Sequence, residues 1–373
     1  MAENNQKKII LLIILAFLVR LVFIYPQYSG DIKNHIAWGQ SIVEQGTANF
    51  YERDFPGFND ANYPPLTILL FGVSYFVYQL KILSLTFINQ SLSLFPSFII
   101  PYTETANFQA LFFKLPAIFA DLGIGWLLCR FTRSKLIASF YLFNPAVIYI
   151  STVWGQIESI PIFFLLLALF LIKNKKLTLS HLAFLASILT KQTALWLTPV
   201  FLIIWFKNQT KKQFILGLFL QLLGFILIYL PFTNPTNAIN SYFNTLSGSS
   251  VVISDAAWNI WFFIAHPNTS DTTPFLGLTF RLWSIIFLVG IYSITSAKLF
   301  KKKGFNQVTL SLFLLSLAAF FLQTRVHERH LFPALVFLLL LDFKNKNLLL
   351  LSYMALSSYH MLNLYYSLDL PFI

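Results

Sequence analysis

The sequence predicts an all-α polytopic membrane protein that forms a single domain over residues 1–373. Its composition is 57% hydrophobic and only 11% charged, and the mean hydropathy is +0.69. A soluble domain of average composition carries roughly 25% charged residues. Apolar runs as long as a membrane-spanning helix recur along the chain, without the alternation of polar and apolar residues that marks barrel strands.

The breaks between the apolar runs predict about 11 to 13 transmembrane helices. The first run follows Lys7 and Lys8 but lacks a small-x-small cleavage site, so we expect a retained helix and not a signal peptide. Several runs are shorter than the roughly 20 residues of a full span, and we expect these to be tilted or to be half-spans. The expected helices lie near residues 9–25, 66–80, 82–100, 108–129, 136–153, 158–172, 178–190, 194–206, 213–231, 280–297, 305–322, 331–341 and 348–363.

Lysine and arginine collect in alternate connections between these runs. Most of the 26 Lys and Arg fall in one set, which the positive-inside rule assigns to the cytoplasm together with the N-terminus. The formal charge of +12 is therefore an orientation signal, and we expect no nucleic-acid partner. Both long connections, residues 26–65 and 232–279, lie on the opposite face with most of the acids, so we expect the working face to be outside.

The first outer loop, in which we expect short interfacial helices, offers a candidate general base. Asp31 follows the first apolar run closely, and a carboxylate there can take a proton from an acceptor hydroxyl. Helix capping is the alternative interpretation, because aspartate commonly caps and the following residues have helical spacing. His35 and Tyr63 belong to the same loop, and Tyr63 precedes a Pro-Pro pair that favours extended backbone. Asp54 and Asp60 are candidate second carboxylates or solvated turn residues.

Two further stretches place polar side chains at the outer ends of apolar helices. In FNPAVIYISTVWGQIES, Gln156 and Glu158 can bond sugar hydroxyls while Trp154 packs on a sugar face. A helical hairpin with an interfacial tryptophan is the alternative. In LTKQTALWLTP, Lys191 and Gln192 lie between two short helices, and Lys191 departs from the positive-inside pattern. It therefore needs an anionic partner or ligand, unless it snorkels.

The stretch TRVHERHLFP concentrates charge between two apolar runs. On a continuing helix, Arg325 and Arg329 share one face and Glu328 lies beside Arg325. The cationic donors outnumber the single carboxylate, which indicates a phosphate ligand. A guanidinium fork suits phosphate oxygens, and His327 can donate or move a proton. An internal ion-pair network is the alternative.

Taken in order, these stretches resemble the GT-C superfamily of polyprenyl-phosphate-sugar-dependent glycosyltransferases, in particular bacterial relatives of the GPI-anchor mannosyltransferases. The resemblance rests on Asp31 with Trp38 and Gly46, then YPPL, FNPAVIYISTVWGQIES, LTKQTALWLTP and RVHERHLFPAL, and it spans most of the chain. Many members of the superfamily have two neighbouring acids in the first outer loop, whereas Ile32 and Lys33 follow Asp31 here. We therefore expect no metal site.

The resemblance implies a GT-C-type fold and inverting transfer of a hexose, mannose or else glucose, from a polyprenyl-phosphate donor to a hydroxyl of a lipid or glycan acceptor. It makes Asp31 the base and implies no cofactor. Short loops favour a bacterial plasma membrane, with membrane lipids as surroundings and the active site on the outer face. We assign the donor phosphate to Arg325, His327, Arg329 and Lys191. We assign the other substrate contacts to His35, Tyr63, Trp154, Gln156, Glu158, Gln192 and Glu328.

A transporter or lipid flippase of the cell envelope is the alternative function. It predicts ionisable residues deep within several helices, whereas Arg20, Lys114 and Asp121 are the few present. A scaffold subunit of an envelope complex is a third class. A scaffold tolerates a charge-neutral change at Asp31, which an enzyme that uses this carboxylate does not.

Overall fold

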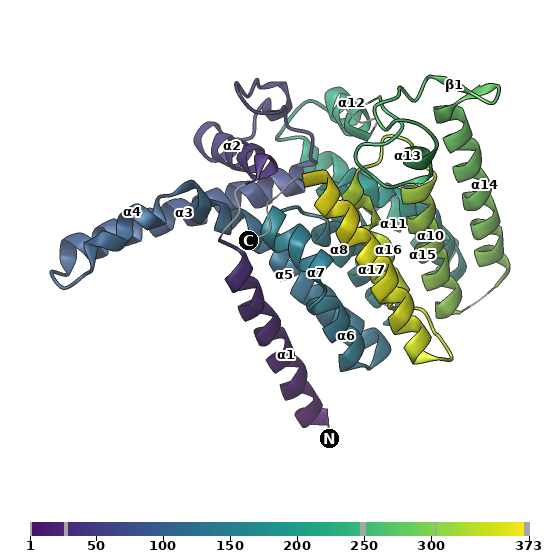
Figure 1. The fold of residues 1–373 in the computed structure, drawn as a ribbon, viewed down its shortest axis with the longest axis horizontal. Helices are drawn as coiled ribbons and strands as arrows, with labels where there is room; N and C mark the ends of the chain where they lie inside the picture. Colours follow the sequence, from purple (N-terminus) through teal and green to yellow (C-terminus); the bar gives the residue numbers. More distant parts are fainter. Residues whose placement is uncertain (1, 26–28, 247–250, 303, 369–373) are drawn as a thin grey trace.

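The computed structural model describes residues 2–25, 29–246, 251–302 and 304–368, and it is almost entirely helical (Figure 1). The helices form one bundle from which the end of α3 and α4 project sideways, and a small β-hairpin lies beside one end of α14. Residues 26–28 and 247–250, which belong to the two predicted outer loops, lie outside the described part. The prediction of an all-α chain is confirmed for the described ranges.

The elements follow one another along the chain with short connections, except in the two outer loops. The first part of the chain contains α1 (Ala2–Phe23), α2 (Gly30–Gln45), η1 (Phe50–Glu52), α3 (Pro65–Ser91), η2 (Ser97–Ile99), α4 (Ile100–Thr103), α5 (Ala106–Thr132), α6 (Lys135–Leu142), α7 (Pro145–Ile148), the π-helix η3 (Tyr149–Trp154), α8 (Ser159–Lys173) and α9 (Leu177–Thr190). The second part contains η4 (Gln192–Leu197), α10 (Thr198–Asn208), α11 (Lys211–Tyr229), α12 (Pro235–Leu246), α13 (Ile260–Ile264), β1 (Pro274–Phe275), β2 (Leu278–Thr279), α14 (Phe280–Lys301), α15 (Phe305–Phe321), η5 (Glu328–Leu331), α16 (Phe332–Leu338) and α17 (Lys346–Leu368).

Four of the described helices, α3, α5, α11 and α14, are long and apolar enough to cross a membrane. The bent pair formed by α6 and the segment Pro145–Trp154, with 49° between its halves, makes a fifth if it counts as one span. Only 11% of the apolar window of α11 is buried inside the protein, against 61% for α5. An apolar helix surface that the protein leaves uncovered is typical of contact with lipid, so this is the architecture of an integral membrane protein.

The predicted break between helices at 66–80 and 82–100 is wrong, because α3 runs without interruption from Pro65 to Ser91. The break was placed at Lys81, as a cation that ends an apolar run. In the structure the Lys81 ammonium donates to the Thr103 carbonyl at 2.5 Å and lies 4.4 Å from the centre of the Tyr78 ring. These contacts let the helix continue past a charge. In Figure 1, α3 runs across the direction of α1 and α17.

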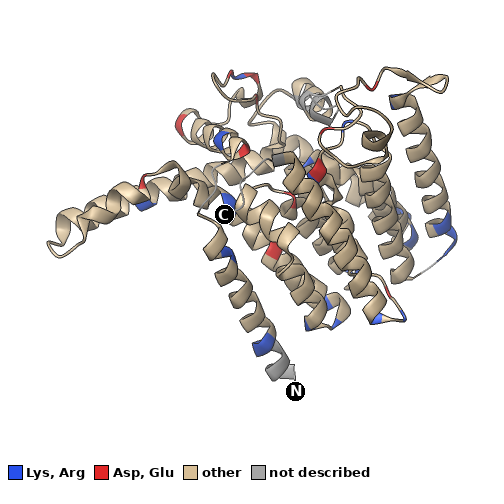
Figure 2. Ribbon diagram, viewed as in Figure 1, with Lys and Arg blue, Asp and Glu red and all other residues tan. Residues whose placement is uncertain are grey.

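The charges separate along the bundle. Figure 2 shows Lys and Arg at the lower ends of α1, α6, α14 and α17, whereas most Asp and Glu lie around α2 and the loops at the opposite end. We call these the basic end and the acidic end. Since α3 replaces two predicted crossings by one helix, counting crossings alone would move every later connection to the other side. In Figure 2 the Lys and Arg of α6, α14 and α17 nevertheless lie at the same end as those of α1, as the alternation in the sequence predicts. Which end faces the cytoplasm stays a prediction.

Inside the bundle, the fully buried Asp121 on α5 pairs with the equally buried Arg20 on α1 at 3.3 Å. The same carboxylate accepts hydrogen bonds from the hydroxyls of Tyr141 at 2.7 Å, Ser151 at 2.6 Å and Ser159 at 2.5 Å. These donors come from α6, η3 and α8. A buried charge is tolerable only when it is paired and hydrogen-bonded, and this carboxylate satisfies both conditions.

The amphipathic helix α2 packs closely against α3 at the acidic end. At the closest approach, a Cβ atom added to Gly39 would lie 2.6 Å from the carbonyl oxygen of Phe71 and 2.8 Å from the Phe113 ring. A backbone oxygen inside a long helix cannot move aside as a flexible side chain can. Glycine at position 39 therefore sets the distance between the helix that carries Asp31 and the rest of the bundle.

We expect Gly39→Ala to destabilise the folded protein by about 1–3 kcal/mol, because the added methyl group overlaps the α3 backbone. Thermal unfolding of the purified protein in a mild detergent measures the change. Gly290→Ala on α14 is the matched control, since a Cβ there meets no atom within 4 Å, and it should leave the stability unchanged or raise it. Equal melting temperatures for Gly39→Ala and the unaltered protein would contradict the packing argument.

Candidate active site

The helix that carries Asp31 begins one residue before it and is capped by Ser29. The Ser29 hydroxyl accepts a hydrogen bond from the Ile32 amide at 3.3 Å and donates one to the Trp154 carbonyl at 2.9 Å. The alternative prediction that Asp31 itself caps the helix is therefore wrong. Asp31 lies in the first turn, where the helix dipole favours a negative charge, and its side chain is available for other contacts.

The partner segment of α2 is the end of the π-helix η3, which stops at Gly155. Gly155 has a φ of +84°, and an added Cβ would lie 2.4 Å from the Ile32 side chain. Both features require glycine at this position. The amides of Gly155 and Gln156 both donate to the Ile150 carbonyl, at 3.1 and 2.9 Å. The chain is thereby turned so that the side chains before and after the glycine face α2.

These two side chains hold the Asp31 carboxylate. Its Oδ2 atom accepts a hydrogen bond from the Trp154 indole at 2.9 Å and another from the Gln156 amide at 2.6 Å. The Tyr63 hydroxyl donates to Oε1 of Gln156 at 3.4 Å and so orients the amide. Among the described residues, Oδ1 of Asp31 has no hydrogen-bond donor. The carboxylate is fixed by one oxygen and keeps the other for a ligand.

Asp31 and Trp154 line a surface cavity of about 570 Å³ at the acidic end. Its remaining wall comes from the first turns of α2 and from the loop around Gly57 to Asn59, where the Asn34 side chain accepts a hydrogen bond from the Asn59 amide at 3.0 Å. Sequence reasoning did not find Asn34 or Asn59, because nothing in their local pattern separates them from ordinary polar surface residues. The candidate second carboxylates, Asp54 and Asp60, are exposed and lie outside this lining.

His35 lies one turn after Asp31 and is buried under the site. Its ring stacks on Phe71 at 4.3 Å and lies 5.7 Å from the Tyr63 ring. Burial lowers the pKa of His35 to about 3, against the opposing attraction of the Asp31 carboxylate. The imidazole is therefore neutral at pH 7, and its Nδ1 atom has no hydrogen-bond partner among the described residues. In this structure His35 forms part of the aromatic wall behind the base.

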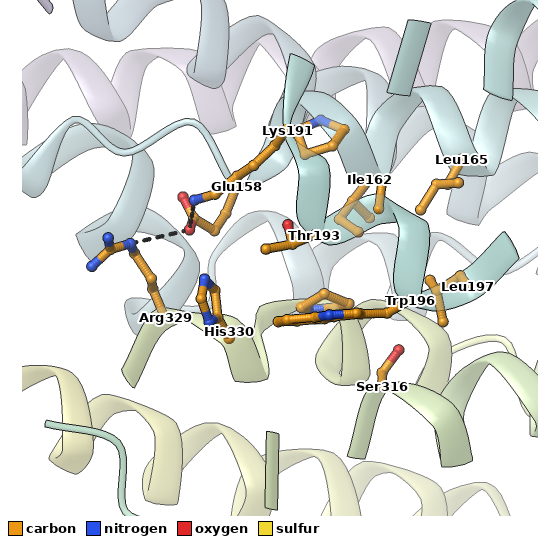
Figure 3. Close-up of a pocket in the computed structure, with 13 residues that line it drawn as sticks. Glu158, Ile162, Leu165, Lys191, Thr193, Trp196, Leu197, Ser316, Arg329 and His330 are labelled. Atoms are coloured by element: carbon orange, nitrogen blue, oxygen red, sulfur yellow. Dashed lines mark hydrogen bonds and ion pairs between the residues drawn. The ribbon is translucent and has the colours of Figure 1, made fainter. Parts of the chain in front are cut away.

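Next to the Asp31 group lies a buried ion-pair cluster, of which Figure 3 shows Glu158, Lys191 and Arg329. Glu158 pairs with the Lys191 ammonium and lies 3.3 Å from Nε of Arg329, and Arg329 donates from Nη1 to Glu328 at 2.9 Å. The four side chains are between 4% and 14% exposed. The anionic partner predicted for Lys191 is thus Glu158. The cavity between this cluster, Trp196 and His330 measures about 20 Å³, which is room for roughly one water molecule.

Two aromatic rings join the cluster to the Asp31 group. The Arg329 guanidinium lies 5.2 Å from the centre of the Trp154 ring, and the Lys191 ammonium lies 5.5 Å from that of Tyr63. Each ring therefore lies beside a cation of the cluster and also belongs to the Asp31 hydrogen-bond network.

Burial raises the pKa of Glu328, while the neighbouring Arg329 charge opposes the rise.

TRVHERHLFP does not continue a helix, so the helical spacing considered for Arg325, Glu328 and Arg329 does not apply. Helix α15 ends at Phe321, Arg325 has a left-handed φ of 62°, and a short 3₁₀ helix begins only at Glu328. Arg325 consequently does not lie beside Glu328. It binds Asp271 of the second outer loop with two hydrogen bonds, Nε to Oδ2 at 2.7 Å and Nη2 to Oδ1 at 3.1 Å. Asp271 lies 54 residues away, so no local pattern predicted this pair.

The second outer loop also covers His327. The Nδ1 atom of His327 lies 3.6 Å from the Asp255 carboxylate, and both side chains are about one third exposed, at 33% and 36%. The Asp255 amide donates to the Val326 carbonyl at 3.0 Å, which fixes the loop against this segment. The Gln192 amide, at the start of η4, donates to the Asn62 carbonyl of the first outer loop at 3.1 Å. Of the predicted site residues, Arg325 and His327 therefore contact the second loop and not Asp31.

The argument that cations outnumber carboxylates in TRVHERHLFP does not hold in three dimensions. Asp271 pairs with Arg325, and Glu158 and Glu328 pair with Arg329 and Lys191.

In the part of the chain that the structure describes, no group of three or more His, Cys, Asp or Glu residues is placed to hold a metal ion. No protein-family model and no curated protein matches the chain.

We expect Glu158→Gln to destabilise the protein strongly, by about 3–5 kcal/mol, because it leaves two buried cations with one carboxylate. Thermal unfolding in detergent measures the loss. The double variant Glu158→Gln/Lys191→Met removes one charge of each sign and should recover much of the stability. A double variant that is no more stable than Glu158→Gln would show that charge matching does not govern this cluster.

The stability of the protein should fall as the pH is lowered from 7 to 5. Below pH 6.5 the unfolded chain takes up a proton on His35, whereas the folded protein, in which the pKa is about 3, does not. At pH 5 this difference amounts to about 2 kcal/mol. His35→Phe should therefore flatten the pH dependence of the melting temperature. An identical dependence in the variant and the unaltered protein would mean that His35 does not cause the loss.

Proposed function

We propose that the protein is a membrane glycosyltransferase of the GT-C type that moves a hexose from a polyprenyl-phosphate donor to an acceptor hydroxyl. The observation that carries the proposal is the Asp31 carboxylate. It is held through one oxygen by Trp154 and Gln156 and lines an open cavity of about 570 Å³. The lipid-anchored donor follows from the membrane architecture, and mannose, or else glucose, follows from the resemblance in sequence.

The chemistry assigns one step to Asp31. The acceptor hydroxyl binds in the cavity and gives its proton to Oδ1, while its oxygen attacks the anomeric carbon. The bond between that carbon and the lipid phosphate breaks, and its electron pair leaves with the phosphate. A direct displacement of this kind inverts the anomeric configuration. Trp154 and Gln156 keep the carboxylate in one orientation, which lowers the entropic cost of reaching the reactive geometry.

We keep Arg325, His327, Arg329 and Lys191 as the proposed contacts of the donor phosphate, on the resemblance in sequence alone, because carboxylates pair with Arg325, Arg329 and Lys191 in the structure. Of these, His327 has the most accessible side chain, at 33% exposed, whereas Arg329 is 14% and Lys191 6% exposed. Binding a phosphate through Arg329 or Lys191 requires the buried ion pairs with Glu158 to open. We therefore propose that the donor phosphate first contacts His327. In a second step the phosphate moves toward the Arg329 guanidinium.

We further propose that the acidic end faces the outside of a bacterial plasma membrane, with the N-terminus in the cytoplasm and 11 to 13 crossings in total. The separated charges support this orientation. The shorter apolar helices α8, α9 and α15 are 15, 14 and 17 residues long, and packed inside the bundle they would supply three of the crossings beyond the four long helices.

Asp31→Asn should lower sugar transfer by about 10²–10⁴-fold, the usual contribution of a general base, while the protein still folds. The assay reconstitutes the full chain in liposomes with a panel of polyprenyl-phosphate monosaccharides and a lipid extract as acceptor. Release of polyprenyl phosphate is the readout, and it also identifies the sugar.

Asp54→Asn and Asp60→Asn are matched controls, because both carboxylates are exposed in the same loop and neither lines the cavity. Both variants should transfer sugar at the rate of the unaltered protein. Normal turnover by Asp31→Asn would refute the base assignment. Failure of the unaltered protein to consume any donor in the panel would count against the whole proposed function.

A further inference from the structure

A second polar cavity, of about 350 Å³, lies at the basic end of the bundle, between the ends of α8, α10, α14 and α15. Three lysines line it, Lys173, Lys207 and Lys302, and among the described residues no Asp or Glu does. The cluster at the acidic end is different, because there a carboxylate matches each buried cation. The proposed sugar transfer does not use this cavity.

The three lysines have different contacts. The Lys207 ammonium donates to the carbonyls of Leu299, Phe300 and Lys302 at 2.9, 3.0 and 2.8 Å. It therefore ties the end of α10 to the end of α14 and makes this wall of the cavity rigid. The Lys173 ammonium lies 5.3 Å from the centre of the Phe305 ring. Lys173 and Lys302 are both exposed, and neither has a carboxylate partner in the described part of the chain.

The rest of the cavity is apolar. Ile172, Ile203 and Val308 line it beside the lysines. Helix α14, which forms one wall, has only 17% of its apolar window buried inside the protein. The cavity thus combines a basic rim with hydrocarbon side chains next to a helix surface that faces lipid. A soluble anion satisfies the rim alone, whereas a phospholipid satisfies both parts.

We propose that this cavity binds the headgroup of an anionic phospholipid, with the phosphate between Lys173 and Lys302 and the start of the acyl chains against the apolar wall. Basic pockets between membrane helices at a cationic face are suited to such headgroups. Lys207 has a positioning role, since its three donors are already used by the end of α14. The proposal is independent of the chemistry at Asp31.

The test titrates dioleoylphosphatidylglycerol onto the purified full-length chain in a neutral detergent and follows binding by native mass spectrometry. Lys173→Gln/Lys302→Gln should weaken binding by roughly 10-fold to 30-fold, because a lysine near an anionic lipid contributes about 1 kcal/mol. Its melting temperature without added lipid should equal that of the unaltered protein. Dioleoylphosphatidylcholine and inorganic phosphate serve as comparison ligands and should bind much more weakly.

Lys211→Gln/Lys212→Gln is the matched control. It removes the same charge from two exposed lysines at the same end of the bundle, at the start of α11, and should leave binding unchanged. The site is refuted if both double variants weaken binding equally, because attraction is then diffuse, or if Lys173→Gln/Lys302→Gln binds normally. Equal binding of inorganic phosphate would refute a lipid as the occupant, and equal binding of phosphatidylcholine would refute the role of charge.

Discussion

The buried Asp121 carboxylate holds together the elements on which the candidate site stands. It accepts hydrogen bonds or an ion pair from α1, α6, η3 and α8, and leaving it without them would expose a charge to an apolar interior. One of its donors, Ser151, belongs to the π-helix that ends at Trp154. The packing of the bundle interior therefore determines the position of the Trp154 indole, which donates a hydrogen bond to Asp31. Gly155 then allows α2 to approach this segment closely.

The ionisable groups at the candidate site balance one another except for one carboxylate. There are three carboxylates, Asp31, Glu158 and Glu328, and two cations, Lys191 and Arg329. Asp31 is the carboxylate that has neutral donors only, from Trp154 and Gln156. A carboxylate without a cation of its own can accept a proton without breaking an ion pair. This distinguishes Asp31 from Glu158 as a base.

The class of the protein could be predicted from the sequence, because it depends on local patterns. The residues around Asp31 could be named from their types and from the resemblance, although Trp154 and Gln156 lie 123 and 125 residues away from it along the chain. Long apolar runs indicated membrane helices, and Asp31, Trp154 and Gln156 were named and lie in one hydrogen-bond network. The pairing of Arg325 could not be predicted, because its partner comes from a loop 54 residues away. The predicted break at Lys81 is wrong for a related reason: the Thr103 carbonyl at the end of α4 accepts a hydrogen bond from the Lys81 ammonium, and α3 continues past this charge.

The two ends of the bundle use charge in opposite ways. At the acidic end, Glu158, Glu328 and Asp271 fix the cations, which makes the surroundings of Asp31 rigid and its field well defined. Rigid surroundings suit a reaction in which a few tenths of an ångström matter. At the basic end, Lys173 and Lys302 have no carboxylate partner among the described residues, and exposed cations suit attraction to a membrane surface. Paired charges at the acidic end therefore suit a reaction, and unpaired lysines at the basic end suit binding of an anionic lipid.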